Sequence, residues 1–130
     1  MKVKVAALKK HYGRTRAVDG ITFEFEGGQI YGFVGPNGAG KSTTMRILAT
    51  LEEPTAGDCY IDGLSVTEEP EKTHRLVGYV PDHEPTHRDV SVHDYLDFFA
   101  RAYGVKGPQR HQMVQSIEDF CGLVGLRDKH

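Results

Sequence analysis

The sequence lacks any long apolar run and any strong excess of charge of one sign. No stretch of its 130 residues approaches the ~20 apolar residues that a helix needs to cross a bilayer. We therefore expect no direct insertion into a membrane. The formal net charge is -2, which provides no basic surface of the kind that binds nucleic acid, so we expect no nucleic-acid partner.

Cysteine is scarce as well, with only Cys59 and Cys121 in the chain. The two are far apart in the sequence and show no metal-ligand spacing, so we expect buried free thiols in a reducing cytoplasm. The opening stretch MKVKVAALKK alternates like a strand and has no apolar core typical of a signal peptide. Together these features predict a globular chain that is cytoplasmic.

Glycine, in contrast, is abundant, and six of the 15 glycines fall between Gly27 and Gly40. They surround the stretch GPNGAGKST (35–43), which an apolar segment (29–34) precedes and a helix-forming segment (42–49) follows. A strand, a glycine-rich turn and a helix start with Lys-Ser at the junction match the phosphate-binding P-loop, G-x-x-x-x-G-K-[ST].

The P-loop pattern suits a triphosphate for a physical reason. Backbone N–H groups approach dense negative charge only where no side chain blocks them, which accounts for Gly35, Gly38 and Gly40. The helix that begins near Lys41 adds unpaired N–H groups and the positive end of its dipole. We expect Lys41 to reach the β- and γ-phosphates and the Ser42 hydroxyl to bind Mg²⁺. The alternative is a glycine-rich turn that happens to precede a helix; the complete match favours binding of a nucleoside triphosphate.

Strand patterns dominate the first part of the chain. Alternation at its start predicts a half-buried strand with Ala7 on the same face as Val3 and Val5, and Leu8 on the other face. Gly27-Gly28 joins two further apolar runs, which predicts a hairpin between them. The expected strands are 3–7, 21–25, 29–34, 58–61 and 76–80, the last of them compact and buried.

Helical patterns follow residue 90. Ser91 with Asp94 three residues later resembles a capping box, and the helix that it opens should end near Gly104. A second helix is expected from about 108 to 122. The expected apolar faces are Tyr95, Leu96, Phe98 and Phe99 for the first helix, and Met113, Ile117, Phe120, Cys121 and Val124 for the second.

Taken together, these stretches resemble the ATP-binding subunit of ABC transporters. YGFVGPNGAGKSTTMRIL (31–48) resembles the family's Walker A segment, and EPTAGDCYIDG (53–63) resembles the turn and strand that follow it. LVGYVPD (76–82) resembles the strand that enters the Q-loop, and DVSVHDYLDFFARAYG (89–104) the start of the helical subdomain. Tyr12 followed by AVDGITFEFEGGQI resembles the opening strands with their adenine-stacking aromatic residue.

The resemblance implies an α/β fold of the P-loop NTPase class, similar to the ABC ATPases. It implies an ATP-binding core over 1–90, with an antiparallel β part, Walker A and a Q-loop-like segment, and the start of an α-helical subdomain over 91–130. The sequence contains no LSGGQ-type signature, no Walker B run ending in Asp-Glu and no downstream switch histidine. We therefore expect an incomplete, amino-terminal part of the domain that does not hydrolyse ATP alone and tends to aggregate, because unpaired strands expose backbone groups.

The resemblance also assigns roles to residues. Asn37, Gly38, Ala39 and Gly40 would cradle the phosphates, while Lys41, Ser42 and Thr43 would bind phosphate and Mg²⁺. Tyr12 would stack on the adenine ring; the alternative is a loop aromatic that caps the hydrophobic core.

The sequence departs from the family pattern at Asp82, where the family usually has Gln. A carboxylate is a good ligand for Mg²⁺ but donates no hydrogen bond when ionised, so metal contact is expected to survive better than the positioning of water. The alternative is a solvated turn residue after Pro81. His83, His87 and His93 have no neighbouring Cys that would complete a zinc site. We expect them to be polar surface residues where this lobe meets its partner.

The function implied by the resemblance is Mg-ATP binding, as part of an ATPase that powers transport through a membrane permease. The implied partners are that permease and a second ATP-binding subunit, at the cytoplasmic face of the membrane. Two alternatives stay open: a nucleotide-binding module that never hydrolyses, and a soluble ABC-type ATPase without a permease. The transported substrate and the direction of transport cannot be inferred from these residues.

Overall fold

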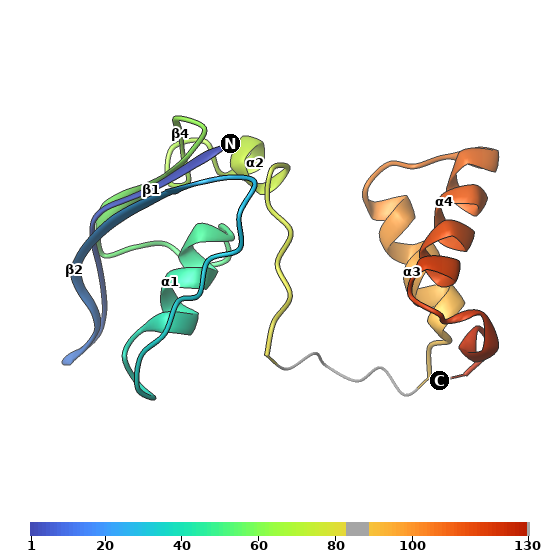
Figure 1. Cartoon of the computed structure of the whole chain (residues 1–130), viewed down its shortest axis with the longest axis horizontal. Helices are drawn as coiled ribbons and strands as arrows, with labels where there is room; N and C mark the ends of the chain where they lie inside the picture. Colours follow the sequence, from blue (N-terminus) through green and yellow to red (C-terminus); the bar gives the residue numbers. More distant parts are fainter. Residues whose placement is uncertain (83–88, 130) are drawn as a thin grey trace. The chain divides into compact units, whose positions relative to one another are not determined.

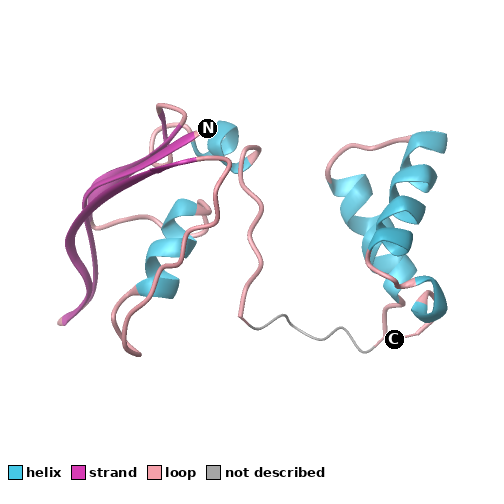
Figure 2. Cartoon of the chain, viewed as in Figure 1, coloured by secondary structure: helices cyan, strands magenta, loops and turns pink. Residues whose placement is uncertain are grey.

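A computed structural model describes residues 1–82 and 89–129 of the chain, which form two compact units, Met1–Val80 and Pro81–His130. The first unit contains a β-sheet and two helices, and the second is helical (Figures 1 and 2). The domain division expected at residue 90 stays a prediction. Within the described residues no helix has the length and apolar character that crossing a membrane requires.

The sheet of the first unit is antiparallel and has the strand order β2-β1-β3-β4. Strand β1 (Lys2–Tyr12) pairs with β2 (Thr15–Glu26) on one side and with β3 (Ala56–Ile61) on the other. The short strand β4 (Leu64–Ser65) pairs with β3. The strands expected at 3–7, 21–25 and 58–61 are therefore confirmed, and all three are longer than expected.

The expected hairpin between 21–25 and 29–34 is wrong. Strand β2 forms its hairpin with β1 instead, through the tight turn at Gly13-Arg14, where Gly13 has φ +58°. The segment 29–34 belongs to no strand of the described chain. A segment forms a β-strand only when its backbone is hydrogen-bonded to a neighbouring strand. Strand β2 makes these bonds with β1, which precedes it in the sequence.

The segment 29–34 packs against β2 through side chains. The ring centroids of Phe33 and Phe23 lie 5.4 Å apart, and those of Tyr31 and Phe25 lie 5.0 Å apart. Both distances are typical of aromatic pairs in contact. Aromatic packing thus orders this segment beside the sheet without a ladder of backbone hydrogen bonds.

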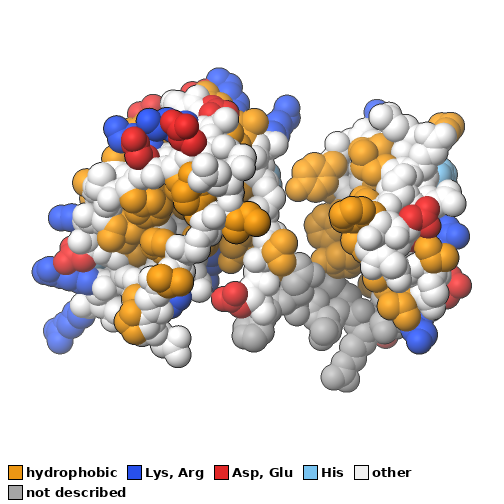
Figure 3. Space-filling model, viewed as in Figure 1, with side chains coloured by type: hydrophobic (Ala, Val, Ile, Leu, Met, Phe, Trp, Pro, Cys, Tyr) orange, Lys and Arg blue, Asp and Glu red, His pale blue; other side chains and the backbone are white. Residues whose placement is uncertain are grey.

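The outward side chains of this segment are apolar as well. Ile30 is 102% exposed and Val34 is 90% exposed. The segment 76–80, expected to be a compact buried strand, likewise belongs to no strand of the described residues, and its Val80 is exposed. That expectation is therefore wrong for this structure, because burial of a central strand requires neighbours on both sides. Figure 3 shows apolar side chains gathered on the visible face of the first unit.

A bulge in β1 reverses the expected positions of Ala7 and Leu8. Pairing with both neighbouring strands shifts register after Val5 and Ala6, and Ala7 has φ +48°. Leu8 is consequently fully buried, whereas Ala7 is exposed. The extra residue of a bulge changes which side chains face the core, and strict alternation does not anticipate it.

Helix α1 (Lys41–Leu48) lies on the concave side of the curved sheet (Figure 1) and completes the core. Its Ile47 and Leu48 join the buried side chains of the sheet. The short helix α2 (Pro70–His74) begins with proline and buries Thr73. The core cluster consists of Val3, Val5, Leu8, Val18, Ile47, Leu48, Cys59, Ile61 and Val66.

The second unit pairs helix α3 (Val92–Ala102) with helix α4 (Gly107–Phe120), followed by the 3-10 turn η1 (Val124–Leu126). Ser91 caps α3 as expected: its hydroxyl oxygen accepts a hydrogen bond from the Asp94 backbone N–H at 3.1 Å, and the hydroxyl donates to the Asp94 carboxylate at 2.7 Å. Asp97 of α3 forms ion pairs of 2.6 Å with both Arg101 and Arg110. Because Arg110 belongs to α4, this carboxylate joins the two helices.

The apolar face expected for the second helix is wrong in the described chain. Val114 and Glu118 are the buried residues of α4, while the expected face is largely exposed. Glu118 faces His93, with 2.8 Å between Oε1 and Nδ1. The helical spacing correctly predicted that α4 forms. The side of α4 that is buried, however, is the one on which Glu118 contacts His93 of α3. Cys121, expected to be buried, is exposed at the end of this helix, whereas Cys59 is buried as expected.

Candidate nucleotide-binding site

The P-loop of the first unit turns sharply at residues 37–40 and leads directly into α1. Gly38 and Gly40 adopt φ of +81° and +84°, values that residues with a side chain rarely adopt. Gly40 is the N-cap of α1, and its carbonyl oxygen accepts hydrogen bonds from the backbone N–H and the hydroxyl of Thr44, both at 2.9 Å. These bonds begin the helix at the end of the loop, and the first N–H groups of a helix have no partner within it.

Gly40 also lies against β2. A Cβ on Gly40 would lie 2.2 Å from the carbonyl oxygen of Ala17 and 2.9 Å from Cγ2 of Val18. No side chain fits between the two backbones. This contact fixes the loop to the hairpin of β1 and β2, which carries Tyr12 at its end.

Lys41 folds back over the loop that precedes it. Its Nζ donates hydrogen bonds to the carbonyl oxygens of Gly35 and Pro36, both at 2.8 Å. Ala39 N–H donates to the Pro36 carbonyl oxygen at 3.2 Å, which closes the turn. A cation at the mouth of a turn lined by backbone N–H groups matches the charge of a phosphate chain.

The hydroxyl residues that follow Lys41 differ in exposure. Ser42 is exposed and Thr43 is half-buried, so both lie at the start of α1 with access to solvent. Thr44 is buried, and its hydroxyl is bonded to the Gly40 carbonyl oxygen. A hydroxyl oxygen beside a lysine is a donor set that fits Mg²⁺ with a bound phosphate. The structural role of Thr44 was not predicted from the sequence.

Tyr12 ends β1 and has 43% of its surface exposed. Its hydroxyl donates a hydrogen bond to Oε1 of Glu52 and accepts one from Nη2 of Arg46 at 3.3 Å. Lys10 Nζ lies over the ring, 5.1 Å from its centroid. The contacts with Arg46 and Glu52 could not be predicted from the sequence, because both residues are remote from Tyr12 along the chain.

The Glu52 carboxyl is only 16% exposed. Burial by itself would raise the pKa of this group, but the hydrogen bonds from Tyr12 and Lys10 and the charges of Arg46 and Lys10 together lower it below its ordinary value. The Arg46 guanidinium has a raised pKa because of its hydrogen bond to Tyr12 and the charge of Glu52. Both shifts favour the charged forms of Glu52 and Arg46, which face each other at 3.0 Å.

The remaining sequence-predicted residues lie in the second unit or outside the described residues. Asp82 is exposed and belongs to the second unit, so its metal contact stays a prediction. His83 and His87 lie outside the described residues, and His93 contacts Glu118. In the part of the chain that is described, no group of His, Cys, Asp or Glu could hold a metal ion by itself.

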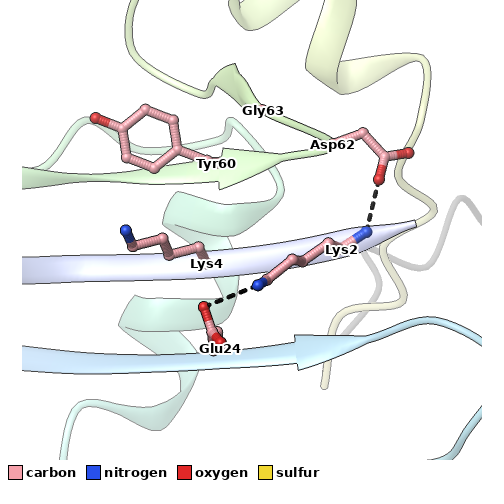
Figure 4. A pocket seen from close by; sticks show the side chains of 6 residues that line it. All are labelled: Lys2, Lys4, Glu24, Tyr60, Asp62 and Gly63. Atoms are coloured by element: carbon pink, nitrogen blue, oxygen red, sulfur yellow. Dashed lines mark hydrogen bonds and ion pairs between the residues drawn. The ribbon is translucent and has the colours of Figure 1, made fainter.

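A depression lies on the open face of the sheet, on the side opposite α1 (Figure 4). Lys2 forms an ion pair with Glu24 at 3.2 Å, and its backbone N–H donates to Asp62 at 2.6 Å. Lys4 and Tyr60 lie beside them (Figure 4). Charges that already pair with one another are common on the solvated face of a sheet, so the P-loop is the better nucleotide site.

Comparison with known proteins agrees with this geometry. The family model for ABC transporters matches residues 18–130. A daunorubicin/doxorubicin resistance ATP-binding protein of Streptomyces peucetius is 34% identical over 127 residues, which are 98% of this chain and 38% of that protein. Nod factor export ATP-binding protein I of Ralstonia nicotianae is 32% identical over 126 residues, which are 97% of this chain and 39% of the relative.

Solved structures lead to the same family. The structure of an ATP binding subunit of an ABC transporter superposes with a TM-score of 0.80 at 25% identity, over 99% of this chain and 54% of that one. The expected α/β fold of the ABC ATPase kind is thus confirmed. The chain spans about two fifths of the length of the two curated relatives. The match over 18–130 and the likeness in fold show that the chain belongs to the ABC transporter family, as part of its ATP-binding domain.

Proposed function

We propose that the first unit binds Mg-ATP through its P-loop, and that this binding serves an ATPase that powers transport through a membrane permease. The observation that carries the proposal is the placement of the Lys41 ammonium over the turn formed by residues 35–40, next to the start of α1. Positive charge, backbone N–H groups and the absence of a blocking Cβ converge there.

Each residue of the loop would have a distinct part in binding. Asn37, Gly38, Ala39 and Gly40 would supply backbone N–H groups to the phosphates, and Lys41 would neutralise their charge. Ser42 and Thr43, with access to solvent at the helix start, would hold Mg²⁺ and phosphate. When bound, Mg²⁺ supplies further neutralisation of the phosphate oxygens.

Tyr12 would provide a stacking surface for adenine. Its exposed ring lies at the end of β1, and β2 contacts the P-loop at Ala17. Stacking of two aromatic rings contributes about 1 kcal/mol. Tyr12→Ala should therefore weaken ATP binding about fivefold and leave the fold intact.

Asp82 would be a further Mg²⁺ ligand, in place of the glutamine usual in the family. An exposed carboxylate is a suitable hard-oxygen ligand. The substitution Asp82→Ala tests this: the Mg²⁺ concentration required for ATP binding should rise. An unchanged Mg²⁺ requirement would identify Asp82 as a turn residue only.

ATP binding is tested with two lysine variants of the full chain. Lys41→Ala should weaken Mg-ATP binding roughly tenfold to a hundredfold, as expected for a charged contact of ~1.5–3 kcal/mol. Lys4→Ala removes the same charge from the open face of the sheet and should leave affinity unchanged. Isothermal titration calorimetry measures both, and circular dichroism confirms that each variant is folded. Equal affinities of the two variants would reject the P-loop as the binding site.

The transport role rests on the relatives, one of which is named for Nod factor export and another for drug resistance. The name of the Nod factor relative favours export as the direction. The test is to tag the protein in its native cells, solubilise the membranes and identify what co-purifies. A multi-pass membrane protein and a second ATP-binding subunit are expected. Recovery from the soluble fraction alone, without such partners, would favour a soluble ABC-type ATPase.

A further inference from the structure

Tyr12 is held at its hydroxyl by two residues that come from beyond the P-loop. The hydroxyl donates to Glu52 Oε1 and accepts from Arg46 Nη2 at 3.3 Å. Arg46 Nη2 also lies 3.0 Å from Glu52 Oε2, so the three groups form a closed triangle. A hydrogen bond to a carboxylate is stronger than one between neutral groups. The direction in which the tyrosine ring extends is therefore fixed.

Lys10 covers the ring itself. Its Nζ lies 5.1 Å from the ring centroid, within the range of a cation–π contact. The same Nζ lies 3.2 Å from Glu52 Oε1 and donates to the backbone carbonyl oxygen of Glu53 at 2.7 Å. Three partners thus hold the ammonium in place, and the ammonium fixes the plane of the Tyr12 ring.

We propose that Lys10 and Glu52, assisted by Arg46, are positioning residues that orient Tyr12 for base stacking, with the base on the ring face opposite Lys10. This inference rests on the proposed function, since it presumes that Tyr12 contacts adenine. The exposed surface of Tyr12 leaves room for a planar base. A side chain that is ordered before the ligand arrives loses less entropy on binding, and this strengthens affinity.

A purely structural role is the competing explanation. The same contacts join the end of β1 to α1 and to the turn after it, and they could stabilise the unit without affecting the nucleotide. The two roles differ in which part of the ligand they affect. Positioning of Tyr12 acts on the base alone, whereas loosening of the unit would also disturb the phosphate loop.

The experiment compares two ligands, Mg-ATP and Mg-tripolyphosphate, which has no base. Glu52→Gln keeps the shape of the side chain and removes its charge. It should weaken Mg-ATP binding about threefold to tenfold, the range expected for one side chain that must be ordered. Binding of Mg-tripolyphosphate should not change. The matched control is Glu24→Gln, which removes a carboxylate from the open face of the sheet and should change neither affinity.

A double-mutant cycle identifies the route of the effect. Tyr12→Phe keeps the ring but removes the hydroxyl, so it should weaken Mg-ATP binding by a similar factor. If Glu52 acts through that hydroxyl, the double variant should bind Mg-ATP no more weakly than either single variant. Independent, multiplying effects would overturn the proposal, as would equal losses for both ligands.

The same measurements separate this inference from the proposed function. If the unmodified chain binds neither ligand, the P-loop assignment fails, and the inference fails with it. If it binds both ligands and Tyr12→Ala leaves the ratio of the two affinities unchanged, the P-loop assignment stands. In that case stacking on Tyr12, and with it the positioning role, is rejected.

Discussion

A Cβ built on Gly40 would lie 2.2 Å from the backbone carbonyl oxygen of Ala17, so the phosphate loop and strand β2 meet backbone to backbone. Ala17 lies two residues after Thr15, which pairs with Tyr12 across the hairpin. The contact therefore joins the phosphate-binding loop to the strand end that carries the aromatic ring. Glycine at position 40 is therefore required for two reasons: its positive φ, and the close approach of the Ala17 backbone.

The first prediction compares Gly40→Ala with Gly38→Ala. Both glycines have φ above +80°, and an alanine there costs about 1–2 kcal/mol. Only Gly40 has atoms in the way of a Cβ, which adds about 1–3 kcal/mol of overpacking. We expect Gly40→Ala to lower the free energy of unfolding of the first unit by more than Gly38→Ala does. Urea unfolding checks this, and equal losses would show that the contact with Ala17 is not rigid.

Local patterns were sufficient to predict the P-loop and the start of α3. Lys41 bonds to a carbonyl oxygen only five residues earlier, and Ser91 bonds to Asp94 three residues later. For such local motifs, the spacing of the residues in the sequence determines which groups come into contact. This is why the loop, the helix that follows it and the Ser91 cap of α3 were correctly predicted.

Pairing and packing between distant segments could not be predicted in this way. The segment 29–34 has the composition of a strand, but a strand needs a partner, and none of the described strands pairs with it. The bulge at Ala7 depends on pairing with two strands. The contact of Tyr12 with Glu52 spans 40 positions of the chain. Nothing in the local sequence encodes these relationships.

The second prediction concerns the two thiols. Burial and the charge of Asp58 raise the pKa of Cys59 to about 12, whereas Cys121 is exposed. Because the thiolate is the reactive form, only Cys121 should react with a thiol reagent at pH 8. Colorimetric thiol counting should find one reactive group in the folded chain and two after unfolding. Two rapid reactions without denaturant would mean that the core around Cys59 opens readily.

The third prediction is the pH dependence that follows from Cys59. The folded chain keeps the thiol protonated up to about pH 12, while the unfolded thiol deprotonates near its ordinary pKa of 9.0. The folded state then binds more protons than the unfolded state between these values, so stability decreases as pH rises through this range. Cys59→Ala should remove that part of the pH dependence. Urea midpoints at pH 8, 9 and 10 measure it, and an identical slope in the variant would contradict the assignment.

The fourth prediction compares the effects on stability of replacing two serines of the second unit by alanine. Ser91→Ala removes the N-cap of α3 and should destabilise that unit by about 1 kcal/mol. Ser116 is exposed within α4, and its hydroxyl donates to the Gln112 carbonyl oxygen at 2.7 Å, one turn earlier. Ser116→Ala should be neutral or slightly stabilising, since alanine is the better helix former. Thermal unfolding followed at 222 nm distinguishes them; equal losses would mean that the cap contributes nothing specific.

The last prediction concerns the apolar segment 29–34. Its aromatic rings face β2, while Ile30 and Val34 are exposed on the other side. Apolar side chains on both faces are typical of a strand inside a covered sheet. Alone in solution, the chain should therefore self-associate through this surface.

Ile30→Lys tests this, because a charge on the exposed side should oppose association without affecting the packed aromatic rings. Sedimentation velocity over a range of concentrations should show large species for the unmodified chain and mostly monomer for the variant. Thr15→Lys adds the same charge at the exposed tip of the hairpin and should leave association unchanged. If both variants associate as the unmodified chain does, the association occurs through a surface other than the segment 29–34. The second unit, where Phe120 is 92% exposed, would then be the next candidate.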